Sequence, residues 1–176
     1  MNQTINEPSA LEKDAKKNLK ITISIDVYNS ASELPIKYQK LLQEAKEATK
    51  SAYAPYSQFF VGAAILLHDQ TIVRGNNQEN AAYPSGICAE RTAIYYTGAQ
   101  YPRHKIEAIA VIARREGDYF LPAAPCGACR QAMLEYEEKQ QKPIKLILQA
   151  EDEQIYVLDS VADLLPLKFG KESLEK

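Results

Sequence analysis

The segment GICAERTA, residues 86–93, places a cysteine two positions before a glutamate. Farther along the chain, the segment PCGACRQ, residues 125–131, places two cysteines in a Cys-x-x-Cys spacing. Together the two segments contain all three cysteines of the 176-residue chain: Cys88, Cys126 and Cys129. Because an odd number of cysteines does not suit a disulfide framework, we expect reduced thiols with a structural, metal-binding or catalytic role.

Both segments are expected to begin a helix, and this placement favours a metal site. The i, i+3 spacing puts Cys126 and Cys129 on one face of their helix. Helix N-termini carry partial positive charge, which stabilises thiolates, and three converging thiolates suit Zn²⁺. Neither His68 nor His104 has a ligand-like spacing to a cysteine. Three cysteine ligands therefore leave one of the four coordination positions of zinc for water, as in catalytic zinc sites.

The alternative reading of the Cys-x-x-Cys segment is a redox-active pair. That reading would leave the upstream Cys-Ala-Glu segment without a role.

Two charged residues beside Cys88 fit the chemistry of such a site. A zinc ion with three thiolates carries a net negative charge, so Arg91 is expected to donate hydrogen bonds to the sulfurs. Glu90 is expected to act as the base that takes a proton from water. Without the cysteines, the pair would be read as ordinary exposed residues in the first turn of a helix.

Composition places the chain among single-domain globular proteins. It is 45% hydrophobic and 25% charged, with a net charge of −2, so no basic face for nucleic acid is expected. Apolar runs such as Val61–Leu67 are too short to span a bilayer. The polar first residues do not resemble a secretion signal, and a cytoplasmic location is expected.

The hydrophobic pattern predicts alternating helices and strands. A long helix is expected within residues 32–54, with Ser32 as its N-cap and its end before Pro55. A hairpin is expected to turn at Asp69–Gln70. The other expected strands cover residues 19–28, 105–114, 143–149 and 154–158, and the other expected helices cover residues 87–97 with Gly98 as C-cap, 126–141 and 159–166.

This order predicts a three-layer α/β/α domain around a mixed sheet of about five strands. The domain is expected over residues 31–170. Residues 1–30 are expected to form an N-terminal extension that adds a strand or arm without a catalytic part, and residues 171–176 a flexible tail.

The order Cys-x-E and then P-C-x-x-C matches the Cys₃ form of the zinc deaminase signature. In four segments the chain resembles the small homotetrameric cytidine deaminases, and these segments occur in the family's order between roughly residues 52 and 170. They are AYAPYSQFFVGAA (52–64), GNNQENAAYPSGICAERTAI (75–94), APCGACRQ (124–131) and DLLPLKFG (163–170).

The resemblance implies zinc-dependent hydrolysis of cytidine and 2′-deoxycytidine to uridine and 2′-deoxyuridine plus ammonia, as in pyrimidine salvage. It also implies one Zn²⁺ per subunit and a homotetramer whose sites are shared between subunits. No nucleic-acid or membrane partner is implied.

The resemblance further assigns roles to individual residues. At the metal it implies Cys88, Cys126 and Cys129 as zinc ligands, Arg91 as their neighbour and Glu90 as the proton shuttle. For the substrate it implies Asn77 and Glu79 as ribose contacts, Phe59 as a wall for the pyrimidine, and the backbone of Ala89 and Cys126 as base contacts. Between subunits it implies that Tyr83 and Phe169 approach a neighbouring subunit's site and that Tyr56 supports this arrangement. Read alone, NNQEN would be a turn, Phe59 a core residue and Phe169 a tail residue.

Two other functions remain open at this point. One is deamination of another substrate, such as a nucleotide, an RNA or DNA base or a nucleoside antibiotic. The other is a non-enzymatic zinc module for protein interaction, which would need a closed site with four protein ligands.

Overall fold

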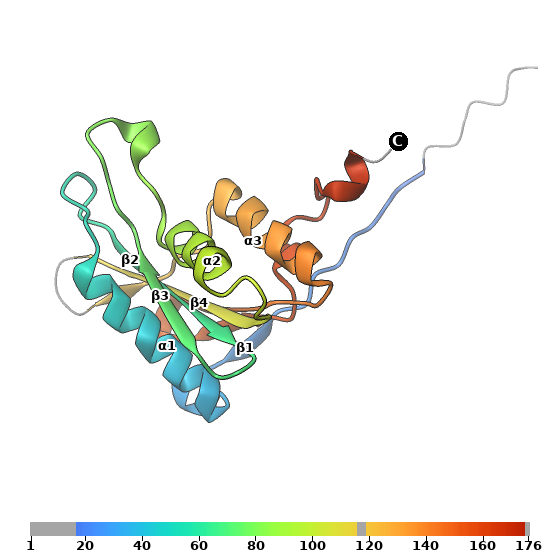
Figure 1. Cartoon of the computed structure of the whole chain (residues 1–176). Coiled ribbons are helices and arrows are strands. Elements are labelled where there is room, and N and C mark those ends of the chain that lie inside the picture. Colours follow the sequence, from blue (N-terminus) through green and yellow to red (C-terminus); the bar gives the residue numbers. More distant parts are fainter. Residues whose placement is uncertain (1–16, 116–118, 175–176) are drawn as a thin grey trace, which may run out of the picture.

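The computed structural model of the chain describes residues 17–115 and 119–174. Within them, a mixed sheet of seven strands lies between helices on both faces, as Figure 1 shows. The strands are β1 (Asp26–Tyr28), β2 (Phe60–Leu67), β3 (Ile72–Asn76), β4 (Ile106–Arg114), β5 (Phe120–Leu121), β6 (Lys145–Gln149) and β7 (Ile155–Leu158). The α-helices are α1 (Ile36–Ala48), α2 (Ala89–Gln100) and α3 (Gly127–Gln140). None of the described helices is both long and apolar enough to cross a membrane.

The strand order is β1-β7-β6-β4-β2-β3, and β5 pairs with β4. Strands β4 and β6 are parallel, and the other pairs are antiparallel. The three-layer fold is confirmed, and five of these strands match the expected sheet. The extra N-terminal strand is confirmed as β1, whereas the two-residue strand β5 was not predicted.

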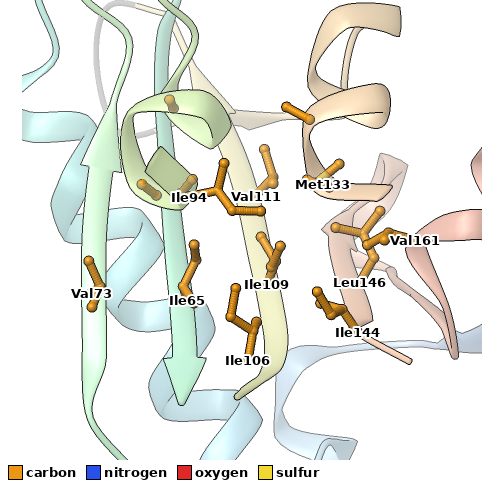
Figure 2. Close-up of a cluster of buried hydrophobic side chains, with 14 of the residues drawn as sticks. Ile65, Val73, Ile94, Ile106, Ile109, Val111, Met133, Ile144, Leu146 and Val161 are labelled. Carbon is orange, nitrogen blue, oxygen red and sulfur yellow. The ribbon is translucent and has the colours of Figure 1, made fainter. Parts of the chain in front are cut away.

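Strand β4 lies inside the sheet and is buried on both faces. Ala110 and Ile112 pack in the cluster under α1, whereas Ile109 and Val111 pack in the cluster under α2 and α3. Figure 2 shows this second cluster, in which Ile94 of α2 and Met133 of α3 lie over the sheet. The sheet and its packing thus hold α2 and α3 side by side, with their N-termini available for a site.

The expected strand over residues 19–28 is wrong in its extent. Only Asp26–Tyr28 is paired, with Asp26 opposite Val157 of β7. Within the described part of the chain, residues 17–25 pair with no other strand. Residues 1–16 of the expected extension and residues 175–176 of the expected tail lie outside the described residues. Of that tail, Lys171–Ser173 form a 3₁₀ turn.

The first helix differs from the prediction at both ends. It begins after Pro35 rather than after Ser32, because the residue before a proline favours an extended backbone. Residues Ala31–Glu33 form a separate 3₁₀ turn, and a second one, Thr49–Ser51, follows the end of α1 at Ala48. The side chain of Ser32 therefore does not cap α1.

Gly98 was predicted to end α2, but it lies inside the helix, which continues to Gln100. A Cβ at residue 98 would collide with the ring of Tyr136 on α3. The glycine thus permits close contact between two helices, and local sequence cannot distinguish that use from a helix C-cap.

Gly75 on β3 has a similar but stricter role, because its neighbour is helix backbone. A Cβ at residue 75 would lie 2.7 Å from the carbonyl oxygen of Ala89 and 2.8 Å from the Cα of Ala93. We expect Gly75→Ala to push α2 off the sheet and to lower the free energy of unfolding by about 1–3 kcal/mol. Urea denaturation measures this change.

The matched control is Gly127→Ala, because a Cβ at residue 127 would meet nothing within 4 Å. The control is expected to leave stability almost unchanged. Equal unfolding midpoints for both variants and the wild type would contradict the role of Gly75 in seating α2.

Candidate metal centre and active site

The three cysteines meet where α2 and α3 begin. Cys88 is the N-cap residue of α2 and Cys126 that of α3, and Cys129 lies in the first turn of α3. The Sγ atoms of Cys88 and Cys126 are 4.0 Å apart, and those of Cys126 and Cys129 are 3.5 Å apart. All three thiols are free. The predicted convergence of two helix N-termini is therefore observed.

The sulfur geometry fits a tetrahedral zinc ion. Zinc–sulfur bonds of about 2.3 Å place two sulfurs of a tetrahedral site roughly 3.8 Å apart, and the observed distances of 3.5 and 4.0 Å bracket this value. Among the described residues, the cluster of potential ligands comprises Cys88, Cys126 and Cys129. This donor set fits one zinc ion per chain.

Protonation of the thiols supports the same conclusion. Contact with the Cys129 thiol, assisted by Arg91, lowers the pKa of Cys88 to about 5. The same contact, together with burial, raises the pKa of Cys129. The thiol of Cys129 is thus favoured over its thiolate in the metal-free cluster, and a bound dication would reverse that preference.

Arg91 lies against the sulfurs, as predicted. Its Nη2 atom donates a hydrogen bond to the Sγ of Cys88 over 3.8 Å. The hydrogen bond to Cys88 raises the pKa of Arg91, and Cys129 adds to this effect. The Nε atom of Arg91 is buried without a hydrogen-bond partner among the described residues. A guanidinium in this position offsets the negative charge of a thiolate cluster.

Glu90 is a buried carboxyl group beside the cluster. It is 5% exposed and lines the same cavity as Cys88 and Cys126. Burial raises the pKa of Glu90, and the negative charge of Cys88 raises it further. A carboxyl group with a raised pKa can both accept and return a proton, which is the property that a proton shuttle needs.

The cavity next to the cysteines has a volume of about 900 Å³. Its lining includes six residues that the sequence singled out: Tyr56, Phe59, Asn77, Glu79, Tyr83 and Arg91. Ala89 is fully buried at the start of α2. Phe169 does not belong to the lining; it is 57% exposed, and its carbonyl oxygen accepts a hydrogen bond from Gln131 of α3.

Asn77 holds the start of β2 in place. Its Oδ1 accepts a hydrogen bond from the Val61 backbone N–H at 2.8 Å, and its Nδ2 donates to the Phe59 carbonyl at 2.9 Å. Asn77 thereby fixes the segment that carries Phe59 at the cavity wall. Each polar group of the amide retains capacity for one more hydrogen bond.

Glu79 is held by the segment that precedes β2. Its carboxylate accepts hydrogen bonds from the backbone N–H groups of Tyr56 at 2.9 Å and Ser57 at 3.2 Å, and from the Ser57 hydroxyl. The hydrogen bond from the Ser57 side chain is the largest cause of the lowered pKa of Glu79. An ionised carboxylate in a fixed position at a cavity wall is a suitable acceptor for hydroxyl groups.

The lining residues that sequence reasoning missed include Ser57 and Arg115. Ser57 has no motif of its own, and only the folded chain brings it to Glu79. Arg115 follows β4 in a loop to which the sequence analysis assigned no role. It adds a second guanidinium to the cavity wall.

Comparison with known proteins agrees with the geometry of the cysteine cluster. The sequence model for the cytidine and deoxycytidylate deaminase zinc-binding region matches residues 35–142. A cytidine deaminase of Sporosarcina psychrophila is 43% identical over 136 residues, which cover 77% of this chain and 93% of that protein. A cytidine deaminase of Halalkalibacterium halodurans is 42% identical over 136 residues, covering 77% and 96%.

Solved structures agree with this relationship. The crystal structure of cytidine deaminase from Burkholderia pseudomallei superposes with a TM-score of 0.64 at 39% identity, covering 75% of this chain and 98% of that one. The cytidine deaminase from Mycobacterium tuberculosis superposes with a TM-score of 0.57 at 32% identity, covering 77% and 99%. The cysteine cluster, the fold and these similarities agree, and the chain belongs to the cytidine deaminase family.

Proposed function

We propose that this protein hydrolyses cytidine and 2′-deoxycytidine to uridine and 2′-deoxyuridine, releasing ammonia. The observation that carries the proposal is a cluster of three cysteine sulfurs within 4.8 Å of one another beside a buried, non-ligating glutamate, Glu90, on one cavity wall. Cys88, Cys126 and Cys129 hold the zinc ion. Membership in the family and the 43% identity to a cytidine deaminase support the choice of substrate.

Glu90 carries the protons of the reaction. When bound, zinc would act as a Lewis acid and make water easier to deprotonate near neutral pH. Glu90 takes the first proton from water, whose oxygen forms a bond to C4 of the base, and passes that proton to ring N3. It then transfers the remaining hydroxyl proton to the amino group. The C4–N bond breaks, and ammonia leaves.

The cavity wall orients the nucleoside. Phe59 packs against the flat base, and the backbone of Ala89 and Cys126 contacts the edge of the base. Glu79 and the free hydrogen-bonding capacity of Asn77 hold the ribose hydroxyls. Arg91 keeps the sulfurs in their thiolate form. These contacts fix the base with its amino carbon toward Glu90.

We further propose a cytoplasmic homotetramer that acts in pyrimidine salvage. The deaminase domain comprises residues 31–170, residues 1–30 form an extension and 171–176 a tail. In the assembly, Tyr83 and Phe169 approach a neighbouring subunit's site, and Tyr56 supports the contact. The exposure of Tyr83 and Phe169 in the single chain supports this arrangement.

Phe169→Ala is expected to raise KM for cytidine, because the base loses a stacking partner supplied by another subunit. Base–aromatic stacking of this kind is worth about 1–3 kcal/mol, which corresponds to a KM roughly 5- to 150-fold higher. Steady-state kinetics of the purified variant measures the change.

A mixing experiment distinguishes sharing between subunits from a role within one chain. Phe169→Ala subunits are reassembled with Glu90→Gln subunits, which lack turnover but retain Phe169. In the mixture, a fraction of the active sites is expected to recover the low KM of the wild type. If the kinetics of the mixture equalled the sum of the kinetics of the two separate variants, this would contradict a role of Phe169 in a neighbouring subunit's site.

The substrate proposal is tested by comparing cytidine, 2′-deoxycytidine, CMP and a short RNA in one assay of ammonia release. Arg115 in the cavity lining makes CMP the informative competitor, since a guanidinium favours a phosphate. We expect kcat/KM to be highest for the two nucleosides. A higher value for CMP or for the RNA would replace this proposal with the corresponding alternative.

A further inference from the structure

The described chain begins with an extended segment that leaves the sheet. We call residues 17–25 the arm; the arm continues into β1, and Figure 1 shows it as the blue trace running away from the sheet. Every second residue from 19 to 27 is a large apolar side chain, and these side chains are 40–81% exposed. They are Leu19, Ile21, Ile23, Ile25 and Val27.

This exposure is unusual for an alternating apolar segment. Alternation places the apolar side chains on one face of an extended chain, and such a face is normally buried. Strand β1 is also the edge of the sheet, and its unpaired backbone groups can accept another strand. The arm and β1 therefore form an open edge that suits an additional antiparallel strand.

The sequence of the arm is complementary to itself when it runs antiparallel. With Ile23 opposite Ile23 of a second copy, Leu19 lies opposite Val27 and Ile21 opposite Ile25, so apolar residues face apolar residues. On the other face, Lys20 lies opposite Asp26 and Thr22 opposite Ser24. Apolar, hydroxyl and oppositely charged pairs are the cross-strand pairs that stabilise a sheet.

We propose that the arms of two copies of this chain pair as an antiparallel ribbon centred on Ile23. The contact has two-fold symmetry, since each pair occurs twice around the central residue. It joins the two sheets through their β1 edges, and the opposed apolar side chains contact each other side by side on one face of the ribbon. This interface does not depend on the deaminase activity.

Charge complementarity favours a second copy over an unrelated partner. Neither Lys20 nor Asp26 forms an ion pair with another residue of the described chain. The symmetric pairing brings Lys20 of each chain to Asp26 of the other, which satisfies both charges twice. A shift of register by one residue would instead place apolar residues opposite polar ones.

Cysteine cross-linking tests the register in the zinc-loaded, full-length protein. Opposed residues of antiparallel strands have Cα atoms about 4.5–5.5 Å apart, within reach of a disulfide. Ile23→Cys is therefore expected to form covalent dimers under mild oxidation. Ile21→Cys is the matched control, because two copies of residue 21 would be about 13 Å apart along the ribbon, too far for a disulfide.

We expect at least about fivefold more reducible dimer for Ile23→Cys than for Ile21→Cys on a non-reducing gel. Mixing Ile21→Cys with Ile25→Cys chains is expected to restore the cross-link, because residues 21 and 25 are opposed. Equal cross-linking of Ile21→Cys and Ile23→Cys, or none in either, would overturn the proposal. Unchanged cytidine turnover shows that the variants are folded.

A charge exchange tests the proposed pairs independently. In the Ile23→Cys background, Lys20→Asp places two carboxylates opposite each other, and we expect most of the cross-link to be lost. Adding Asp26→Lys restores opposite charges in reversed order and is expected to restore the cross-link. A double variant that remains as poor as the single one would overturn the pairing of Lys20 with Asp26.

Discussion

Glu90→Gln is expected to lower cytidine turnover by about 10²–10⁴-fold, the usual contribution of a general acid–base group. The amide has nearly the same shape as the carboxyl group, but it cannot accept a proton from water or return one to the base. Because Glu90 lies beside the sulfur cluster without belonging to it, zinc content is expected to stay at one ion per chain. Steady-state kinetics and metal analysis of the same preparation measure both quantities.

The matched control is Glu47→Gln on α1, because Glu47 is ion-paired with Lys50 at the surface. That variant is expected to keep wild-type turnover. If Glu90→Gln retained normal turnover with normal zinc content, Glu90 would have no part in the mechanism. If it lost zinc together with activity, Glu90 would instead help to hold the metal.

Cys129→Ser is expected to abolish turnover and to lose the zinc ion. Cys129 is fully buried, and its sulfur lies 3.5 Å from that of Cys126, so two thiolates would have to hold the metal alone. A ligand that binds only the folded state stabilises it by about 4 kcal/mol when its free concentration is a thousandfold above Kd. A loss of stability of this order is expected when zinc is present.

A chelator provides the control for this second prediction. Wild-type protein stripped of zinc is expected to unfold at a denaturant concentration close to that of the variant, and added zinc should restore the wild type only. Normal zinc content in Cys129→Ser would contradict a site built from three cysteines. A variant that is much less stable than the stripped wild type would show that the thiol also matters for packing.

The parts of the site that could be predicted from sequence lie close together in the chain. Cys88 and Glu90 are two residues apart, and Cys126 and Cys129 are three apart, so a single helix turn fixes each pair. Gln70, with its positive φ of 71°, lies at the predicted hairpin turn. Local spacing and turn chemistry contain this information.

The parts that sequence could not predict depend on contacts between distant segments. Glu137 is a buried carboxylate on α3 that accepts hydrogen bonds from the backbone of Ile144 and Val161 and from the hydroxyl of Ser160. No pattern around Glu137 distinguishes it from an exposed helix residue. Strand β5 was missed for a similar reason, since its two residues become a strand only beside Ala113 and Arg114.

Tertiary contacts also decided where elements end. The alternation over residues 19–28 predicts a strand, but only Asp26–Tyr28 pairs with β7. Gly98 follows the pattern of a helix end, yet the contact with Tyr136 explains its presence inside α2. Both predicted element ends were wrong, because contacts between elements, which the local pattern does not contain, decided the outcome.

X-ray absorption at the zinc edge of the metal-loaded protein tests the proposed centre most directly. Three cysteines with one remaining position predict three sulfur neighbours at about 2.3 Å and one oxygen neighbour at about 2.0 Å. A spectrum with four sulfur neighbours, or with a histidine in the fourth position, would contradict a site that leaves room for water beside Glu90.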